Sequence, residues 1–133
     1  MSTEDLRLAG LLKRALTRLL ESYGPQAVDP RELAVLSLLG RRGPCSQQEI
    51  SRRLGIDRTT MVALVDTLAG RELVRRRPDP ADRRKNMVEL TTAGETIGVR
   101  AGREVDAAED RFLASLTAAE RQNLLELLRK VVN

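Results

Sequence analysis

The stretch SQQEISRRLGIDRTTMVALVDTLAGREL spans residues 46–73 and decides the fold of this chain. Ser46 and Glu49 have the S-x-x-E spacing of a capping box, in which each side chain pairs with a backbone N–H at a helix start. Gly55 suits the left-handed backbone that ends a helix, and Asp57 is a second N-cap candidate. The stretch therefore predicts two helices separated by a tight turn.

The second of these helices has two contrasting faces. Apolar residues recur at the i, i+3, i+4 and i+7 spacing of an inward face: Met61, Leu64, Val65 and Leu68. The opposite face carries small, polar and basic residues, namely Arg58, Thr59, Val62, Ala63 and Asp66, with Thr60 at its edge. Short side chains let a helix backbone approach base edges, and hydroxyl and guanidinium groups reach bases or phosphates. This face predicts a DNA recognition helix, although Thr59 and Thr60 alone are equally consistent with support of the helix start.

A basic segment, ELVRRRPDPADRRKNMVEL, follows at residues 72–90. Its Pro and Asp residues at 78–82 are typical of a turn, and the flanking segments have the pattern of strands. The segment predicts a hairpin wing with a basic tip that suits a phosphate backbone or a narrow minor groove. The alternative is a solvated hairpin, which is disfavoured because neighbouring cations repel one another without an anionic partner.

The candidate DNA contacts lie in three places. Two of them, Ser46 and Gln47, begin the first helix of the motif. The second helix contributes Arg58, Thr59, Thr60, Val62 and Ala63, and the wing contributes Arg75, Arg77, Arg83, Arg84 and Lys85.

Positive charge is concentrated in the same region. The 133 residues have a formal net charge of +4, and residues 41–90 carry 12 Lys and Arg against 7 Asp and Glu, whereas the rest carries 11 against 12. Arginine makes up 20 of the 23 basic residues, and its planar guanidinium forms bidentate contacts with phosphates and bases. Genome composition is an alternative reason for arginine over lysine, but it does not explain the clustering. The distribution favours double-stranded DNA as a partner.

The sequence lacks the usual residues of catalytic and metal sites. It contains no histidine and a single cysteine, Cys45, so the commonest general base and imidazole ligand are missing. We expect no enzyme activity, no cofactor and no metal. Cys45 is either a redox sensor, which needs an exposed thiolate of low pKa, or a small apolar residue in a short strand beside the wing, which we favour. No apolar run is long enough to cross a membrane, so we expect a cytoplasmic protein.

Helical patterns precede the motif. Residues 4–23 predict a long helix with a broad apolar stripe. Asp29, Pro30 and Glu32 have the order of a helix start with a D-x-x-E capping box, and Gly40 is the expected end of that helix.

Two more helices are expected after the wing. Thr92 with Glu95 and Thr117 with Glu120 have capping-box spacing; the first of these helices should end near Leu116. The terminal helices carry more apolar surface than a small monomer buries, which indicates a two-fold homodimer. The predicted interface residues are Leu8, Leu12, Leu16, Leu124, Leu128 and Val131.

The order of elements resembles the MarR family of bacterial transcription regulators over nearly the whole chain. The most specific part is Asp82-x-Arg84, five residues, then Leu90-Thr91 followed by Ala93-Gly94, which matches the D-x-R-x5-L-T wing signature of the family. The resemblance implies a mainly α fold with a small β-hairpin wing. It also implies a single MarR-type domain, with a winged helix-turn-helix lobe at 29–91 flanked by dimerisation helices at 1–24 and 92–133.

The resemblance further implies how such a protein works. The family forms obligate homodimers on near-palindromic operators, with the recognition helix, here 58–69, in the major groove and the wing tip, here Arg83 and Arg84, in the minor groove. Asp66 and Asp82 would form salt bridges that position the wing. The resemblance therefore predicts a sequence-specific regulator, most simply a repressor. The alternative is a winged helix that coats DNA without sequence preference or binds proteins.

Effectors differ among members of the family. Many members release DNA when a small aromatic or phenolic ligand binds, and others respond to zinc or to oxidation of a cysteine in the first helix. The zinc site does not carry over to a chain without histidine, and Cys45 lies outside the first helix. A small-molecule effector remains the expectation, with no lining residue assigned.

Overall fold

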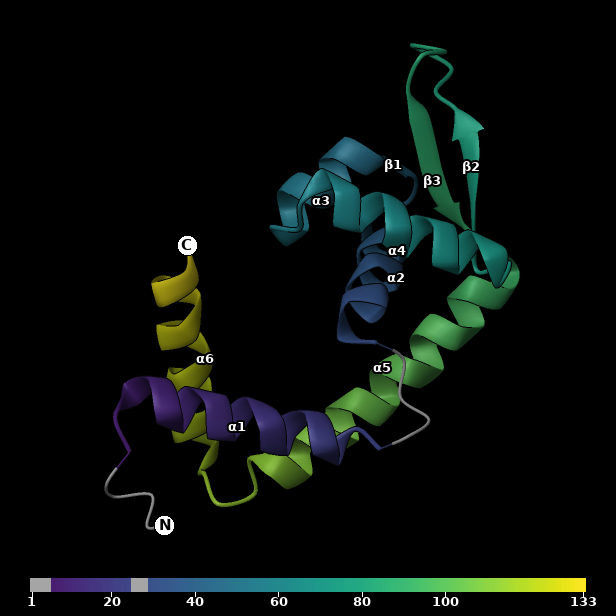
Figure 1. Cartoon of the computed structure of the whole chain (residues 1–133). Coiled ribbons are helices and arrows are strands. Elements are labelled where there is room, and N and C mark those ends of the chain that lie inside the picture. The colour runs from purple at the N-terminus through teal and green to yellow at the C-terminus, as the bar shows by residue number, and fades with distance from the viewer. Residues whose placement is uncertain (1–5, 25–28) are drawn as a thin grey trace. The chain divides into compact units, whose positions relative to one another are not determined.

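The computed structural model describes residues 6–24 and 29–133 of the chain. These residues form six helices and three short strands (Figure 1), so the prediction of a mainly α fold with a small wing is confirmed. The helices are α1 (Leu8–Ser22), α2 (Pro30–Arg42), α3 (Gln47–Leu54), α4 (Arg58–Gly70), α5 (Thr92–Phe112) and α6 (Ala118–Val132). The strands are β1 (Cys45–Ser46), β2 (Val74–Pro78) and β3 (Asn86–Leu90).

The chain divides into two compact units. One unit comprises Met1–Ala27 with Glu104–Asn133, and the other comprises Val28–Arg103. The second unit contains the helix-turn-helix and the wing, and we call it the winged-helix unit. The first unit contains α1, the end of α5 and α6, and we call it the terminal-helix unit.

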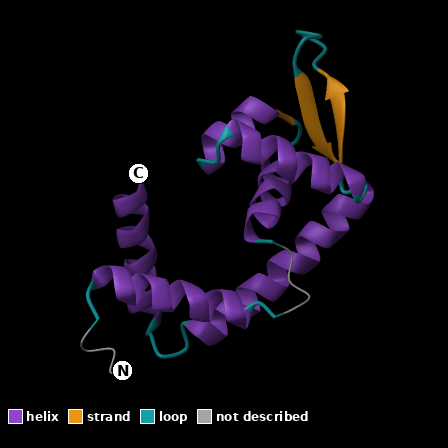
Figure 2. Cartoon of the chain, viewed as in Figure 1, coloured by secondary structure: helices purple, strands orange, loops and turns teal. Residues whose placement is uncertain are grey.

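The core of the winged-helix unit lies where α2, α3, α4 and the sheet meet. The sheet is antiparallel with the order β1-β3-β2, and β2 and β3 form a hairpin that extends away from the helices (Figure 2). Aliphatic side chains and Met61 fill this core because the chain has almost no aromatic residues. The most completely buried are Val35, Leu36, Ile50, Met61, Val65, Leu68 and Val88.

The prediction for Cys45 as a structural residue in a short strand is confirmed. Cys45 is 2 % exposed and pairs with Val88 across β1 and β3. Its thiol donates to the carbonyl of Gly43 at 3.4 Å. Burial, followed by the negative charge of Glu49, raises the pKa of the Cys45 thiol. A buried thiol of raised pKa has little of the thiolate that redox sensing requires.

The first two helix boundaries differ from the prediction. Helix α1 begins at Leu8 instead of residue 4, and no side chain caps it; residues 4 and 5 lie outside the described part of the chain. Helix α2 continues past Gly40 to Arg42 and ends at Gly43, whose φ of 78° is left-handed. The apolar spacing that predicted the helix does not distinguish between two glycines only three residues apart.

The capping predictions hold in part. Only Thr117 and Glu120 form the complete reciprocal box, at the start of α6. At α3 the Ser46 hydroxyl accepts from the Glu49 N–H at 3.1 Å, but the Glu49 carboxylate pairs with Arg53 instead of returning to Ser46. At α2 Asp29 accepts from the N–H of residue 31, and the carboxylate of residue 32 binds a distant arginine. At both helix starts the glutamate is therefore paired with an arginine and does not return to the N-cap.

Helix α5 starts one residue earlier than predicted and ends four residues earlier, at Phe112. Thr91, not Thr92, caps it: the Thr91 hydroxyl accepts from the Gly94 N–H at 3.0 Å and donates to the Glu72 carbonyl at 2.6 Å. Gly94 is required here because a Cβ at this position would lie 1.9 Å from the Leu73 carbonyl oxygen. Gly94, which follows the wing signature in the sequence, thus permits the close approach of α5 to the residue before β2.

Most large apolar side chains of α1 and α6, in the terminal-helix unit, are exposed. Neither α1 nor α6 contains a buried residue. A hydrogen bond from the Arg111 guanidinium to the Ser22 carbonyl joins the end of α5 to α1 at 3.3 Å, and Arg121 of α6 pairs with Asp110. The exposed apolar residues are Leu8, Leu11, Leu12, Leu16 and Leu20 on α1, and Leu125, Leu127, Leu128, Val131 and Val132 on α6. In the described residues, no helix is both long and apolar enough to span a bilayer.

Candidate nucleic-acid interface

A left-handed glycine sets the angle between α3 and α4. Gly55 has φ of 64° and ψ of 30°, and the N–H of Ile56 donates to the Ser51 carbonyl at 3.1 Å. This is the turn that the sequence predicted from Gly55. It buries Met61, Leu64, Val65 and Leu68 of α4 in the core, so the opposite face of α4 points to solvent.

The start of α4 is held by its own N-cap. The Asp57 carboxylate accepts from the backbone N–H of Thr60 at 3.0 Å and from its hydroxyl at 2.6 Å. The bond from the Thr60 hydroxyl is the first cause of a lowered pKa for the Asp57 carboxyl. The hydroxyl proton of Thr60 is therefore committed to Asp57, which favours the supporting role for this residue over base recognition.

The outward face of α4 is exposed along its length. Thr59, Val62, Ala63 and Asp66 all lie on the solvent side, and Val62 is 42 % exposed although it is a large apolar residue. Short side chains at these positions leave the helix surface open to a groove-sized partner.

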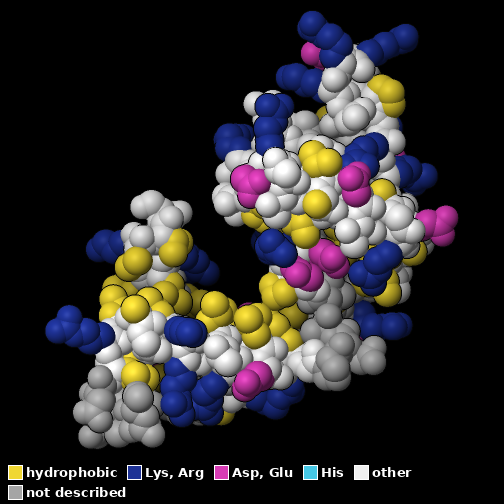
Figure 3. All heavy atoms as spheres, viewed as in Figure 1, with side chains coloured by type: hydrophobic (Ala, Val, Ile, Leu, Met, Phe, Trp, Pro, Cys, Tyr) yellow, Lys and Arg dark blue, Asp and Glu magenta, His cyan; other side chains and the backbone are white. Residues whose placement is uncertain are grey.

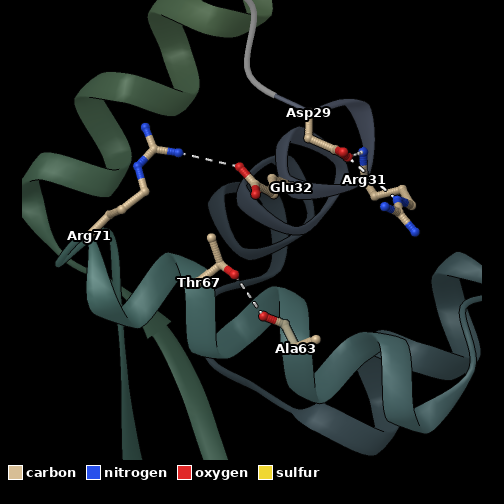
Figure 4. Close-up of polar contacts among 6 residues, drawn as sticks. All are labelled: Asp29, Arg31, Glu32, Ala63, Thr67 and Arg71. Carbon is tan, nitrogen blue, oxygen red and sulfur yellow. Dashed lines mark hydrogen bonds and ion pairs between the residues drawn. The ribbon is translucent and has the colours of Figure 1, made fainter.

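An ion pair joins the residue that follows α4 to the start of α2. Figure 4 shows the Arg71 guanidinium reaching Glu32 at the start of α2, at 3.3 Å, and the Thr67 hydroxyl donating to the Ala63 carbonyl at 3.0 Å. The pair between residues 32 and 71 joins two elements distant in sequence.

In the wing, the paired strands β2 and β3 place one acidic side chain, that of Glu89, between two arginines. Arg75 lies opposite Glu89 in the ladder, and the Glu89 carboxylate contacts the Arg75 guanidinium at 3.0 Å and that of Arg77 at 3.1 Å. Residues two apart in a strand share a face, so one carboxylate spans both. Glu89 neutralises only one of the two positive charges, and Arg75 and Arg77 remain exposed.

Arg76 points to the other face of β2 and braces the wing against the motif. Its Nε donates to the Gln47 side-chain oxygen at 2.7 Å, and its Nη2 lies 2.6 Å from the Asp66 carboxylate. One guanidinium thus joins β2 to the start of α3 and to the exposed face of α4. Asp66 is in a wing-to-helix ion pair, and the oxygen of Gln47 is engaged within the protein.

The tip of the wing is a turn closed by its own polar groups. The Asp79 N–H donates to the Lys85 carbonyl, and the Lys85 N–H donates to the Asp82 carbonyl, both at 2.9 Å. Asp82 also accepts from the Arg84 backbone and guanidinium at 3.1 and 3.3 Å. The Arg84 side chain remains 92 % exposed, and Arg83 and Lys85 are also exposed. Figure 3 shows Lys and Arg side chains gathered at this end of the wing.

The structure thus places the predicted contacts in two groups. The first is the outward face of α4 and the second is the exposed wing with its tip; Ser46 and Gln47 lie between them at the start of α3. The sequence analysis missed Arg76 and Glu89, which organise the wing. Alternation along β2 and the single acid of β3 were the available signals, but their use requires the strand register. Among the described residues, no cluster of three metal-ligating side chains occurs.

Comparison with known proteins identifies the family. The MarR family model matches residues 28–85. The chain is 35% identical to the HTH-type transcriptional repressor NicR of Pseudomonas putida over 92% of its own length and 80% of that protein. The chain belongs to the MarR family. The resemblance seen in the sequence is confirmed, and the MarR assignment makes the chain a DNA-binding winged helix-turn-helix transcriptional repressor and not an enzyme.

Solved structures of two DNA-binding regulators have the same fold as this chain. The transcriptional repressor CouR bound to a 23-mer DNA duplex superposes with a TM-score of 0.87 at 35% identity, covering 96% of this chain and 93% of that one. BpsR of Bordetella bronchiseptica, whose DNA binding is regulated by 6-hydroxynicotinic acid, superposes with a TM-score of 0.82 at 28% identity, covering 95% of this chain and 98% of that one.

Proposed function

We propose that the protein acts in the cytoplasm as a homodimer that binds a near-palindromic operator. In each subunit, α4 enters the major groove through Arg58, Thr59, Val62 and Ala63. The wing tip, with Arg83, Arg84 and Lys85, enters the flanking minor groove. The observation that carries this proposal is the exposure of both surfaces: the Arg84 side chain is 92 % exposed, and Arg58, Thr59, Val62 and Ala63 on the outward face of α4 are all exposed.

Contacts in this arrangement divide into positioning and base recognition. Arg75 and Arg77 share Glu89, so their remaining positive charge suits phosphate oxygens and not a specific base. Ser46 and Gln47 begin α3, and backbone N–H groups at a helix start favour phosphate. Asp66 and Asp82 orient arginines of the wing and do not contact DNA in this proposal.

The proposed dimer uses the terminal-helix unit. Its exposed apolar residues include Leu8 at 71 % and Val131 at 81 % exposure. Contiguous apolar surface of this kind marks an interface in a water-soluble protein. A self-complementary patch contributed by two copies gives two-fold symmetry, which matches a palindromic site with half-sites about 10–10.5 bp apart.

We propose a small aromatic acid as the effector that releases DNA. BpsR, which responds to 6-hydroxynicotinic acid, supports this ligand class. The terminal-helix unit contains a cavity of 370 Å³ whose lining includes Arg14, Arg18 and Phe112. This volume lies within the range of small-molecule sites, and a guanidinium binds a carboxylate in bidentate geometry.

Selection from random duplex DNA by the purified full-length protein tests the function. We expect an enriched inverted repeat, bound with a steep salt dependence of about −0.9 in log–log slope per phosphate contacted. Recovery of DNA without any common sequence would favour a non-specific coating module instead. Titration of the complex with 6-hydroxynicotinic acid and related aromatic acids, with benzylamine as a cationic control, tests the effector class.

A further inference from the structure

The hydrogen-bonding side chains on the exposed face of α4 are largely engaged within the protein. The Thr60 hydroxyl donates to Asp57 at 2.6 Å, and the Asp66 carboxylate is 2.6 Å from Arg76. The Thr67 hydroxyl donates to the carbonyl of Ala63 at 3.0 Å. The middle turn of this face therefore presents two exposed apolar side chains, those of Val62 and Ala63.

An exposed valine at this position differs from ordinary surface apolar residues. Val62 is 42 % exposed on a helix whose other large apolar residues, Met61, Leu64, Val65 and Leu68, are all buried. It lies one turn from Asp66, which the wing holds through Arg76. Val62 therefore has a defined position on the surface between the helix start and the wing.

The chemistry of the major groove limits what such a side chain can recognise. Thymine is the base that offers a methyl group there, on C5, whereas cytosine has only a hydrogen on C5 and carries its N4 amino donor where thymine has the O4 acceptor. A valine packed against C5 therefore gains an apolar contact with thymine that cytosine does not offer. Val62 thus favours thymine by this contact.

We propose that Val62, flanked by Ala63, recognises the 5-methyl group of a thymine in each half-site of the operator. This inference rests on the proposed function and deepens it, because it names the base and the residue that selects it. Thr59 and Arg58 then supply the hydrogen bonds at the neighbouring base pairs.

Replacement of thymine by deoxyuridine tests the contact, since deoxyuridine lacks only the methyl group. The full-length protein is titrated by fluorescence anisotropy against the selected operator with each thymine replaced in turn. We expect one position in each half-site where the replacement weakens binding about fourfold, the factor for one buried methyl-sized group. In Val62→Ala the same replacement should change affinity by a factor near one.

The control is Val99→Ala, which truncates a valine with 53 % exposure outside the recognition helix. This variant should retain the full deoxyuridine effect, and circular dichroism should show native helix content in both variants. An operator with no methyl-sensitive thymine, or sensitivity unchanged in Val62→Ala, would overturn the inference and leave the proposed function standing. Failure to enrich any sequence in the selection is a separate result, which overturns the proposed function itself.

Discussion

Arg76 Nη2 lies 2.6 Å from Asp66 Oδ1, and this ion pair ties the wing strand β2 to the exposed face of α4. The same guanidinium donates to Gln47 at 2.7 Å. The two surfaces that we propose contact one DNA duplex are therefore joined by a single side chain. The Asp66 side chain is 60% exposed, and ion pairs this exposed contribute little to the free energy of unfolding. The effect to test is therefore the position of the wing relative to α4.

Asp66→Asn tests whether the ion pair positions the wing for DNA binding or stabilises the fold. We expect operator affinity to fall about tenfold, equivalent to ~1.4 kcal/mol, because the wing loses its fixed angle to α4. The free energy of unfolding should change by less than about 1 kcal/mol, as for other exposed pairs. Anisotropy titration and urea unfolding measure the two effects. Asp110→Asn is the matched control, since it breaks the exposed pair with Arg121 in the other unit; equal affinity losses in both variants would refute a positioning role.

Arg84→Ala addresses the wing tip. The arginine side chain is 92 % exposed, so its removal should leave the fold intact and weaken DNA binding. If each subunit loses one phosphate contact, the log–log salt slope should become shallower by about 0.9 per subunit. Arg31→Ala, which removes a 58% exposed arginine from the start of α2, should leave the slope unchanged. An unaltered affinity and slope in Arg84→Ala would exclude the wing tip from the interface.

Thr60→Ala should act through the N-cap of α4 and not through one base pair. The variant removes the 2.6 Å bond to Asp57, so we expect reduced thermal stability and a similar loss of affinity on every operator variant. A loss confined to one substituted base pair would restore Thr60 as a base-recognition residue. Single-base operator variants and thermal unfolding provide the comparison.

Acid should weaken the same cap. The bond from the Thr60 hydroxyl lowers the pKa of Asp57 in the folded protein. A lowered folded pKa means that this stabilisation is fully present above the ordinary aspartate pKa and is lost as pH falls through the lower, folded value. Thermal unfolding from pH 7 downwards should therefore show a smaller acid-induced decrease for Asp57→Ala than for the native chain. Identical pH profiles would contradict this role.

Gly94→Ala should destabilise the winged-helix unit severely. The added Cβ would lie 1.9 Å from the Leu73 carbonyl oxygen, and relief requires the backbone to move at the junction of α5 and β2. We expect a loss of at least about 3 kcal/mol in urea unfolding, within the range of severe packing defects. Gly102→Ala is the control on the same helix, because nothing lies within 4 Å of its Cβ; it should stabilise by about 0.5–1 kcal/mol. Similar stabilities for the two variants would refute the close approach.

Cys45 should resist modification in the folded protein. Burial limits access to the thiol and raises its pKa, so iodoacetamide at pH 8 should label it slowly in buffer and rapidly in urea. Cys45→Ser should lower stability by about 1–3 kcal/mol, because a hydroxyl replaces a weakly polar group in the core. Mass spectrometry follows the labelling. Rapid labelling of the native protein together with loss of DNA binding would support redox sensing instead.

Local patterns in the sequence were sufficient to predict the order of the helices and strands. The turn glycine Gly55, the inward spacing of Met61 and Leu64, and the Thr117–Glu120 box each depend on residues a few positions apart, and the structure contains all three. The strand at Cys45 was also predicted, although its pairing partner, Val88, is distant in the sequence. Helix ends were less accurate, as at Gly40, where the helix continues to Arg42, because spacing alone does not select one glycine among neighbours.

Only the tertiary structure shows which arginines are paired within the protein and which are left exposed. The sequence analysis predicted Arg75 and Arg77 as DNA contacts within a basic run and assigned no role to Arg76. The strand register pairs Arg75 and Arg77 with Glu89 and turns Arg76 towards residues 47 and 66. These partners lie far apart in the chain and meet only after the strands pair and pack against the helices. Ion pairs depend on distance in space, while helix periodicity and turns depend on distance along the chain. For that reason the motif was predictable from the sequence, whereas the arginine partner of Asp66 was not.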